Sequence, residues 1–255
     1  MQYGLIGEKL GHSYSAQIHG MFGFYEYELK EIPREGLDRF MCGREFCGIN
    51  VTIPYKEQVI PYLDKVDDAA ASIGAVNTVV NRDGELTGYN TDFLGLKKLM
   101  EYAGHDYNGS TILILGSGGT SKTAAAVCKA LGAGCVGRVS RSGREGTLTY
   151  EEAASRYANA DFVINTTPVG MFPNTDASPV DLRSYPELKG VIDVIFNPAK
   201  TKLMEQAEEL GIRADGGLRM LVYQAVAAAK IFTGKEVSDS RAEEIIEAVR
   251  RTSRG

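Results

Sequence analysis

Residues that bind metals or cross-link chains are scarce in this sequence. It has four cysteines and three histidines among 255 residues. The cysteines contain no C-x-x-C pair, and three histidines do not complete a zinc ligand set. The sequence therefore predicts no metal site, and free thiols in a reduced, cytoplasmic compartment are the simplest interpretation.

Long apolar runs and an excess of positive charge are also lacking. The longest apolar stretch, Met220–Phe232, is interrupted by Gln224 and Lys230 and falls short of the about 20 residues that span a bilayer. The N-terminus reaches Glu8 and Lys9 before the apolar core of a signal peptide can form. The formal net charge of −5 disfavours a nucleic-acid partner. We therefore expect no membrane segment, no signal peptide and no nucleic-acid partner.

Hydrophobic residues and glycine are well represented. The hydrophobic fraction of 44% allows an ordinary buried core, which excludes a mainly disordered chain. At roughly 100–200 residues per domain, the length fits one large domain or two modest ones. The 29 glycines are typical of folds with tight turns and, in α/β enzymes, of a backbone that approaches a ligand closely.

Strand-like runs alternate with helical segments through the first hundred residues. The predicted strands are Tyr3–Ile6, Tyr27–Lys30, Gly48–Ile53, Val76–Val80 and Glu85–Tyr89. The predicted helices are Ser15–Phe22, Glu57–Ser72 and a third from Asp92 to about Tyr102. Asp83-Gly84 between the last two strands predicts a β-hairpin.

From about residue 105 the pattern becomes a regular alternation of buried strands and helices. Thr111–Leu115 is a continuous apolar run of the kind that parallel sheets bury on both faces. The further predicted strands are Cys135–Val139, Phe162–Asn165 and Val191–Ile195, and the helices are Ser121–Leu131, Tyr150–Tyr157, Thr201–Leu210, Leu218 to about Thr233 and Glu236–Arg251. This pattern predicts an α/β fold with a parallel, doubly wound sheet.

The segment Gly116–Ser121, of sequence GSGGTS, follows a buried strand and opens a helix, which is the setting of a dinucleotide-binding loop. Gly116 allows the tight turn, and Gly118 lets backbone N–H groups approach a pyrophosphate at the positive end of the helix. Ser121 replaces the third glycine of the usual pattern and is still small. A glycine-rich turn without a ligand is the alternative, but the strand, the helix and the later βαβ units favour a cofactor.

The segment after the second strand of this region distinguishes between the nicotinamide cofactors. NAD sites usually place an acid there for the ribose 2′-hydroxyl, whereas Arg138–Arg144 has no acid before Glu145. Arg141 and Arg144 can pair with a 2′-phosphate, and Lys122 adds positive charge. Surface cations without a ligand are the alternative, but the cluster favours NADP.

Small polar clusters lie beside glycines in the first hundred residues. They are His12-Ser13-Tyr14-Ser15, Asn50–Lys56, Gly74–Thr78 and Asn90-Thr91-Asp92. Each has a structural interpretation when taken alone. Ser15, Thr91 or Asp92 would cap a helix, Lys56 would be a surface lysine and Asn77 a turn residue.

Together, these four clusters and the glycine loop resemble the shikimate dehydrogenase family. Three later segments carry the same resemblance: Asn165–Met171, Asp193–Pro198 and Gly217–Gln224. The resemblance runs from about Tyr3 to the C-terminal helices. It implies NADPH-dependent, reversible reduction of 3-dehydroshikimate to shikimate in aromatic amino-acid biosynthesis, by a monomer or homodimer.

The resemblance also implies two α/β domains with the active site between them. Residues 1–104 and 218–255 would form the substrate-binding catalytic domain, and residues 105–217 a Rossmann-type NADP-binding domain.

Carried over residue by residue, the resemblance makes Lys56 and Asp92 the catalytic pair. Ser13 and Ser15 would bind the substrate carboxylate, and the ring hydroxyls or neighbouring groups would contact Thr52, Asn77 and Gln224. The cofactor would contact Gly116, Ser117, Gly118, Gly119, Thr120, Ser121, Ser140, Arg141, Arg144, Thr166, Val194 and Gly217.

The sequence departs from the family pattern at three places. Ala16 stands where proline is common, and Ser140-Arg141-Ser142 stands where Asn-Arg-Thr is usual. Phe196 stands where the family generally has a tyrosine whose hydroxyl reaches the substrate. Because one hydrogen bond is typically worth about 0.5–1.5 kcal/mol, Phe196 predicts weaker substrate binding rather than loss of activity.

Two other functions stay open. One is a quinate/shikimate dehydrogenase with relaxed choice of substrate or cofactor. The other is a catalytically silent relative that binds the metabolite as a sensor. The presence of Lys56 and Asp92 argues against the sensor.

Overall fold

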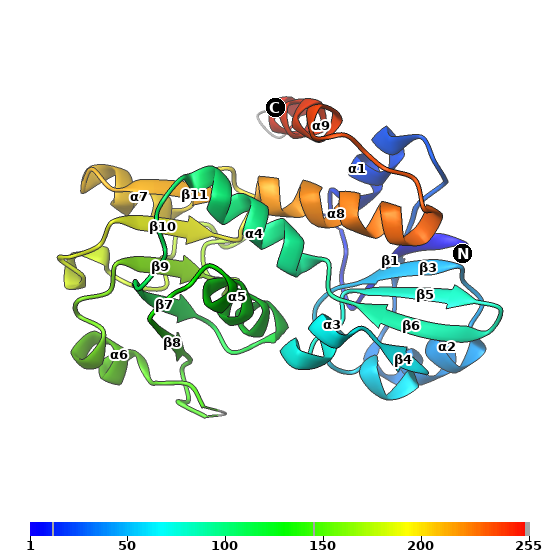
Figure 1. The fold of residues 1–255 in the computed structure, drawn as a ribbon, viewed down its shortest axis with the longest axis horizontal. Helices are drawn as coiled ribbons and strands as arrows, with labels where there is room; N and C mark the ends of the chain where they lie inside the picture. Colours follow the sequence, from blue (N-terminus) through cyan, green and yellow to red (C-terminus); the bar gives the residue numbers. More distant parts are fainter. Residues whose placement is uncertain (12, 145, 253–255) are drawn as a thin grey trace. The chain divides into compact units, whose positions relative to one another are not determined.

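The computed structural model describes residues 1–11, 13–144 and 146–252 and divides into two compact units (Figure 1). The first consists of Met1–Gly95 and Val222–Val249, and the second of Leu96–Leu221 with the described residues from Arg250 on. His12 and Glu145 lie outside the described residues.

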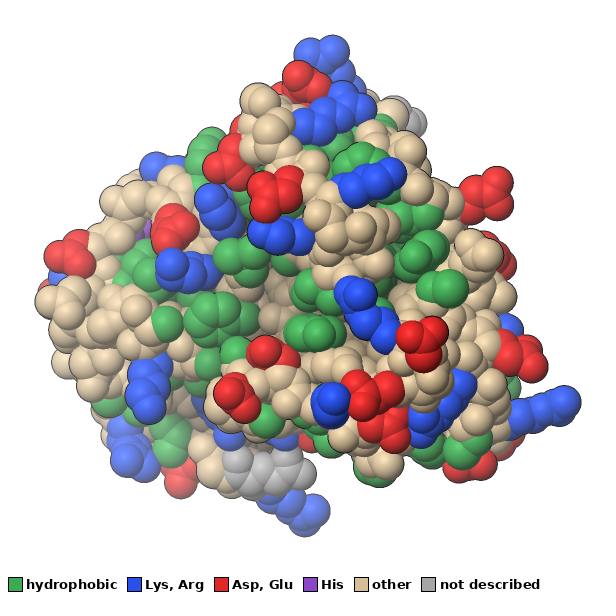
Figure 2. Space-filling model, turned by 45° about the vertical axis from the view of Figure 1, so that its right-hand side comes forward, with side chains coloured by type: hydrophobic (Ala, Val, Ile, Leu, Met, Phe, Trp, Pro, Cys, Tyr) green, Lys and Arg blue, Asp and Glu red, His purple; other side chains and the backbone are tan. Residues whose placement is uncertain are grey.

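The surface carries both positive and negative side chains, in agreement with the similar numbers of basic and acidic residues in the sequence. On the face drawn in Figure 2, Lys and Arg side chains are interspersed with Asp and Glu side chains. In the part of the chain that the structure describes, no helix has both the length and the apolar character needed to cross a membrane.

The first unit is built on a mixed six-stranded sheet in the order β2-β1-β3-β5-β6-β4. Its strands are β1 (Tyr3–Gly7), β2 (Glu28–Glu31), β3 (Gly48–Val51), β4 (Lys65–Val66), β5 (Thr78–Arg82) and β6 (Glu85–Tyr89). β1 pairs in parallel with β2 and β3, whereas β5 is antiparallel to β3 and β6. Asp83 and Gly84, between β5 and β6, have φ of 54° and 90°, as a tight hairpin turn requires. The hairpin prediction is therefore confirmed.

Six α-helices belong wholly or partly to the described residues of this unit. They are α1 (Ser15–Phe22), α2 (Leu37–Gly43), α3 (Asp68–Ile73), α4 (Asp92–Ala103), α8 (Leu218–Thr233) and α9 (Asp239–Thr252). Short 3₁₀ turns cover Arg34–Gly36 and Ile60–Tyr62. α4 and α8 continue from one unit into the other. The helix α2 was not predicted.

The predicted helix over Glu57–Ser72 is wrong. That segment contains the 3₁₀ turn, β4 and the short α3. The backbone N–H groups of Asp64 and Asp67 donate to Leu86 O and Gly88 O, so the segment pairs with β6 instead of coiling on itself. Asp67 then accepts a hydrogen bond from Ala69 N and starts α3. Tertiary pairing overrides the local helical periodicity here.

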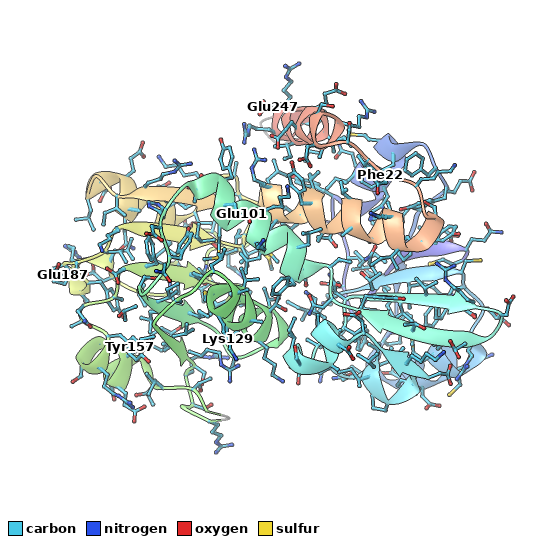
Figure 3. The ribbon with its side chains drawn as sticks, viewed as in Figure 1. Phe22, Glu101, Lys129, Tyr157, Glu187 and Glu247 are labelled. Carbon is cyan, nitrogen blue, oxygen red and sulfur yellow. The ribbon has the colours of Figure 1, made fainter. Side chains whose placement is uncertain are left out.

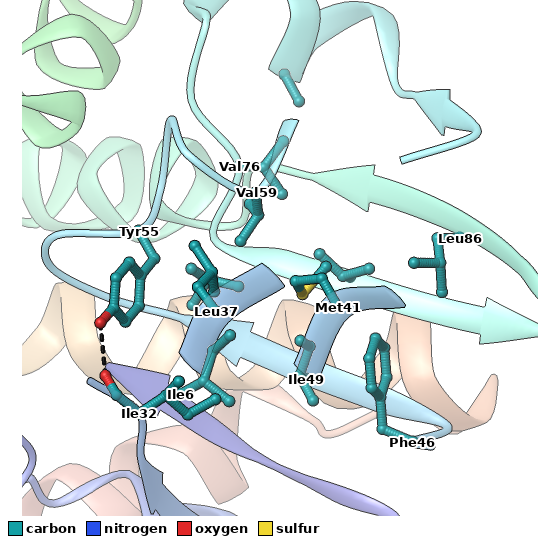
Figure 4. Packing of buried hydrophobic residues seen from close by; sticks show 13 residues of the cluster. Ile6, Ile32, Leu37, Met41, Phe46, Ile49, Tyr55, Val59, Val76 and Leu86 are labelled. Carbon is teal, nitrogen blue, oxygen red and sulfur yellow. Dashed lines mark hydrogen bonds between the residues drawn. The ribbon is translucent and has the colours of Figure 1, made fainter. Parts of the chain in front are cut away.

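Apolar side chains of β1, β3, α2 and the segment after β3 form the core of this unit (Figure 4). Within this core the Tyr55 hydroxyl donates to Ile32 O at 2.5 Å. α8 packs against the sheet at Gly48, where a Cβ atom would lie 2.5 Å from the Phe232 ring. The glycine therefore makes room for a C-terminal aromatic ring in the N-terminal sheet.

The second unit contains a parallel five-stranded sheet in the order β11-β10-β9-β7-β8. The strands are β7 (Thr111–Leu115), β8 (Cys135–Val139), β9 (Phe162–Asn165), β10 (Gly190–Asp193) and β11 (Arg213–Gly216). The helices are α5 (Gly119–Ala130), α6 (Tyr150–Arg156) and α7 (Lys202–Glu209), with a 3₁₀ turn at Leu182–Ser184. The parallel, doubly wound sheet is confirmed, and β11 is a strand that was not predicted.

The strand order has a switch point between β7 and β9. The chain leaves β7 toward β8 on one side and later returns to β9 on the other side. Ligands of such sheets bind outside the carboxyl ends of the strands at this point. The glycine loop follows β7 there.

Candidate active site and nucleotide site

Lys56 and Asp92 form an ion pair in the first unit. Lys56 lies in the turns after β3, and Asp92 is the first residue of α4. Their Nζ and Oδ2 atoms are 2.5 Å apart, and the two side chains are only 14% and 9% exposed. Lys56 is thus not an ordinary surface lysine. Removal of either partner would leave a largely buried charge without its counter-ion.

Asn90 leaves the Asp92 carboxylate available for this pair. Its Oδ1 accepts a hydrogen bond from Phe93 N at 3.1 Å, the bond that a helix cap makes. Its Nδ2 donates to Ala75 O at 2.9 Å. Asn90 therefore makes the capping bond for which the sequence analysis had named Thr91 or Asp92.

Asn77 is buried next to the same helix start, with 3% of its surface exposed. Thr91 N donates to its Oδ1 at 2.7 Å, and its Nδ2 donates to Thr91 Oγ1 at 3.0 Å. Because a backbone N–H can only donate, Oδ1 and Nδ2 are assigned without ambiguity. One of the two hydrogens on Nδ2 is donated to Thr91 Oγ1, and the amide has a second hydrogen that it can donate.

The two serines of the first polar cluster lie together at the start of α1. Ser13 Oγ accepts a hydrogen bond from Ser15 N at 3.2 Å. The N-cap position is Tyr14, which makes no side-chain capping bond, and the first turn holds no acidic residue. Two hydroxyls beside an uncapped helix N-terminus suit an anion such as a carboxylate. The helix begins at Ser15, so Ser15 itself is not the cap.

Thr52 and Gln224 belong to the same unit. A Cβ atom on Gly7 would lie 2.7 Å from Thr52 Cγ2, so the glycine lets the threonine lie close to the end of β1. Gln224 is on α8 and is 8% exposed. The two serines, Thr52, Asn77, Gln224 and the Lys56–Asp92 pair therefore lie in one compact unit. Phe196, which the sequence analysis connected with substrate binding, belongs to the other unit.

The residues assigned to the cofactor lie in the other unit, where at least one of them follows each of the five strands. Gly116 follows β7, Ser140 follows β8, Thr166 follows β9, Val194 follows β10 and Gly217 follows the final residue of β11. Because the strands are parallel, their carboxyl ends meet at one edge of the sheet. Segments far apart in sequence thus converge where such sheets bind nucleotides.

The loop after β7 has the shape that a pyrophosphate needs. Gly116 has φ +124°, and a Cβ atom there would lie 2.4 Å from Thr166 Oγ1. Ser121 Oγ donates to Gly116 O at 2.7 Å, which closes the loop. Gly118 is the N-cap of α5 and leaves the first turn without a side-chain cap or an acidic residue. The residues present therefore fit a dinucleotide.

Hydroxyl groups brace the loop after β8. Ser140 Oγ and Thr147 Oγ1 are 2.7 Å apart, and Gly143 N donates to Ser140 Oγ at 3.1 Å. Arg141 and Arg144, both exposed, lie between these anchors. The loop that carries Arg141 and Arg144 is therefore held in place by hydrogen bonds of its hydroxyl groups. Sequence reasoning missed the role of Thr147, which no motif marks.

Asp193 at the end of β10 is a buried carboxyl group that sequence reasoning also missed. It accepts hydrogen bonds from Asn165 Nδ2 at 3.0 Å, Ile195 N at 3.1 Å and Thr201 Oγ1 at 2.7 Å. Burial raises its pKa to about 6, although these bonds act in the opposite direction. Asp193 therefore holds the segments after β9 and β10 together. The sequence analysis used Asp193 only as part of a family segment, and an acid within an apolar strand was the signal that could have pointed to its structural role.

We expect Asp193 to make the stability of the second unit depend on pH. Its pKa is higher in the folded chain than in the unfolded chain, so raising the pH through about 4 to 6 deprotonates the unfolded state first and destabilises the fold. The free energy of unfolding is expected to fall by about 3 kcal/mol across this pH range. We expect Asp193→Asn, which keeps the shape and one acceptor oxygen, to remove this loss. Denaturant unfolding of both proteins from about pH 4 to about pH 7 measures it, and equal slopes would refute the assignment.

The fold and the two sites define a class of protein: a two-unit α/β oxidoreductase with a Rossmann-type nucleotide unit and a second unit that holds a lysine–carboxylate pair. Comparisons with known proteins specify it further. Residues 5–79 match the model of the shikimate dehydrogenase substrate binding domain, and residues 217–250 that of the shikimate 5′-dehydrogenase C-terminal domain.

Full-length relatives agree with these matches. A shikimate dehydrogenase (NADP(+)) of Clostridium perfringens is 34% identical over 97% of this chain and 98% of its own length. The crystal structure of shikimate dehydrogenase 1 from Peptoclostridium difficile has a TM-score of 0.92, with 33% identity and 99% of each chain covered. A Thermus thermophilus shikimate 5-dehydrogenase in complex with NADP(H) and shikimate has a TM-score of 0.85, with 29% identity over 97% of this chain and 99% of that one. The chain belongs to the shikimate dehydrogenase family.

Proposed function

We propose that the protein reduces 3-dehydroshikimate to shikimate reversibly, with NADPH as hydride donor, as a step in aromatic amino-acid biosynthesis. The observation that carries the proposal is the largely buried Lys56–Asp92 pair in a member of this family. Names of relatives with NADP(+) and the Thermus thermophilus complex support the cofactor and the substrate.

Lys56 and Asp92 carry out the proton chemistry. Bound NADPH supplies a hydride to the ketone carbon, and the carbonyl oxygen then needs a proton. Lys56 Nζ donates that proton, and its positive charge stabilises the alkoxide as it forms. Asp92, at 2.5 Å from Nζ, orients the ammonium group. In the reverse direction Lys56 takes the proton back from the hydroxyl.

Other residues of the first unit orient the substrate. Ser13 and Ser15 bind its carboxylate at the start of α1. Asn77 donates its remaining amide hydrogen to a ring oxygen, and Thr52 and Gln224 contact the ring hydroxyls or neighbouring groups. Fixing the ring in this way places the ketone carbon for hydride transfer and its oxygen for Lys56.

The second unit binds the cofactor. The loop of Gly116–Ser121 holds the pyrophosphate, and Ser140, Arg141 and Arg144 bind the adenosine 2′-phosphate. Thr166, Val194 and Gly217 lie toward the ribose and the nicotinamide. At Gly217 a Cβ atom would be 2.0 Å from Val194 O, so only glycine allows this close approach.

The two functions correspond to two domains in this proposal. Residues 1–104 and 218–255 bind the substrate, and residues 105–217 bind NADP. The boundaries between the compact units lie inside α4 and α8, between residues 95 and 96 and between residues 221 and 222. Each of these two helices therefore contributes residues to both units. We also propose a cytoplasmic enzyme, monomeric or homodimeric, with four free thiols.

A direct assay tests this function. Purified protein is given shikimate or quinate, each with NADP or NAD, and reduced cofactor is measured by absorbance. We expect kcat/KM to be highest for shikimate with NADP. Comparable values with quinate would favour a quinate/shikimate dehydrogenase, and shikimate binding without turnover would favour a sensor.

Phe196 allows a separate test of the substrate site. It lies just after β10 and is half-buried. Because the family generally has a tyrosine here, we expect Phe196→Tyr to lower the KM for shikimate by roughly 2- to 10-fold, which corresponds to one added hydrogen bond. Steady-state kinetics and thermal unfolding of the single variant check this. A raised KM at unchanged thermal stability would show that the site is organised around the phenyl ring.

A further inference from the structure

A series of hydrogen bonds, most of them buried, leads from an aromatic cluster to Asn77. The Tyr27 hydroxyl donates to Asn50 Oδ1 at 2.7 Å. Asn50 Nδ2 donates to Thr78 Oγ1 at 2.9 Å and to Asn77 O at 3.2 Å. Thr78 Oγ1 in turn lies 3.1 Å from Asn77 Oδ1 and 3.1 Å from Thr91 Oγ1. Asn50, Asn77, Thr78 and Thr91 are each less than 5% exposed.

The direction of these bonds is determined at both ends. Asn77 O is a backbone carbonyl and can only accept, so Asn50 must turn its NH₂ group toward Asn77 and its oxygen toward Tyr27. Thr78 then accepts from Asn50 and donates its own hydrogen onward, to Asn77 Oδ1 or to Thr91. Thr91 N also donates to Asn77 Oδ1. The series therefore supplies donors to the oxygen side of the Asn77 amide.

Tyr27 is itself firmly held. Its ring stacks on His19, with centroids 3.8 Å apart and planes inclined by 5°. His19 is fully buried, and burial lowers its pKa to about 3, so the imidazole is neutral. Phe22, labelled in Figure 3 at the end of α1, contacts His19 edge-on. Burial raises the pKa of Tyr27 well above its usual value, so its hydroxyl keeps the hydrogen that it donates.

We propose that Tyr27 and Asn50 are positioning residues for the substrate site. By occupying the oxygen side of the Asn77 amide through Thr78, they make Asn77 present N–H, and not C=O, to the substrate. Asn77 then selects a ring oxygen that accepts a hydrogen bond. This proposal rests on the proposed function, because it assumes that the ligand of Asn77 is shikimate.

The aromatic cluster provides a matched pair of variants. Tyr27→Phe removes the hydroxyl at the start of the series and keeps the ring that stacks on His19. Tyr25→Phe removes a hydroxyl of the same kind, which lies 2.7 Å from His19 Nδ1 and outside the series. Each variant loses one part-buried hydrogen bond, so we expect the two losses of stability to be similar. Only the first is expected to change substrate binding.

The readout is the binding of shikimate measured by calorimetry, together with kcat and KM. For Tyr27→Phe we expect the Kd and the KM for shikimate to rise by roughly 2- to 10-fold, the equivalent of one hydrogen bond. We expect kcat to change by less than about 2-fold, since Lys56 and Asp92 are untouched. Tyr25→Phe is expected to bind shikimate like the wild type.

A double-mutant cycle shows whether Tyr27 acts through Asn77. In an Asn77→Ala background, Tyr27→Phe is expected to leave the Kd for shikimate unchanged, because the amide that it orients is gone. Additive effects would overturn the proposal, and so would equal effects of Tyr27→Phe and Tyr25→Phe in the wild-type background. Wild-type protein that neither binds nor oxidises shikimate would instead refute the proposed function itself, and this inference with it.

Discussion

A Lys56→Ala variant is expected to lose about 10²–10⁴-fold in kcat for shikimate oxidation, the usual contribution of general acid–base catalysis. The variant lacks both the group that exchanges the proton and the charge that stabilises the alkoxide. The KM for NADP is expected to stay near its wild-type value, because the cofactor residues lie in the other unit. Steady-state kinetics measures the loss.

Stability must be measured alongside, because the pair is largely buried. The Asp92 side chain is 9% exposed beside Lys56, and the variant leaves this carboxylate without its counter-ion. Lys56→Met keeps most of the side-chain volume and separates packing from charge. Asp92→Asn, which keeps the shape and removes the charge, is expected to lower kcat in a similar way. If thermal unfolding shows that these variants are folded, a lower kcat reflects the loss of the catalytic group and not the loss of the fold.

Lys65 offers a matched control in the same unit. It forms an ion pair with Glu85 at 2.9 Å, but the two side chains are 64% and 48% exposed. Such surface pairs contribute little to stability, so Lys65→Ala is expected to behave like the wild type. A Lys56→Ala protein with a near-normal kcat would remove Lys56 from the mechanism.

Arg141→Ala is expected to weaken NADP binding by about 10- to 100-fold and to leave NAD binding almost unchanged. The range corresponds to a charge-assisted hydrogen bond of about 1.5–3 kcal/mol. Only NADP carries the 2′-phosphate that the guanidinium group pairs with. Calorimetric titration with the two cofactors measures the difference without catalysis.

The same comparison can be made with fragments. Adenosine 2′,5′-bisphosphate and 5′-AMP differ only in the 2′-phosphate, so Arg141→Ala should weaken the first and spare the second. Arg156→Ala, an exposed arginine at the end of α6, is the control of equal charge in the same unit. Equal losses for NADP and NAD would show that Arg141 does not recognise the 2′-phosphate.

Local patterns predicted many of the elements well. Ser15–Phe22, Glu85–Tyr89, Thr111–Leu115 and Leu218–Thr233 have the predicted bounds, because each has a clear period or apolar run between turn residues. The segment from Glu57 to Ser72 has an equally helical pattern. Its backbone nevertheless pairs with β6, so the segment forms a turn and a strand where a continuous helix was predicted. β11 is short and partly polar, so neither the strand nor its position at the edge of the sheet could be predicted from its sequence.

The sequence by itself determined the kinds of group that this protein brings to its chemistry. The glycine loop after an apolar strand, the arginines without a preceding acid, and the family pattern of Lys56 and Asp92 are all legible in the order of residues. These features depend on short stretches of chain, in which neighbouring residues specify the local conformation.

Only the tertiary structure decided how these groups meet. Lys56 and Asp92 are 36 positions apart in sequence, and the packing of the first unit brings their charged atoms to 2.5 Å. The orientation of the Asn77 amide depends on Thr91 and, through Thr78, on Asn50 and Tyr27. Hydrogen bonds depend on distance and angle between atoms, and for residues so far apart the register of the sheet sets both.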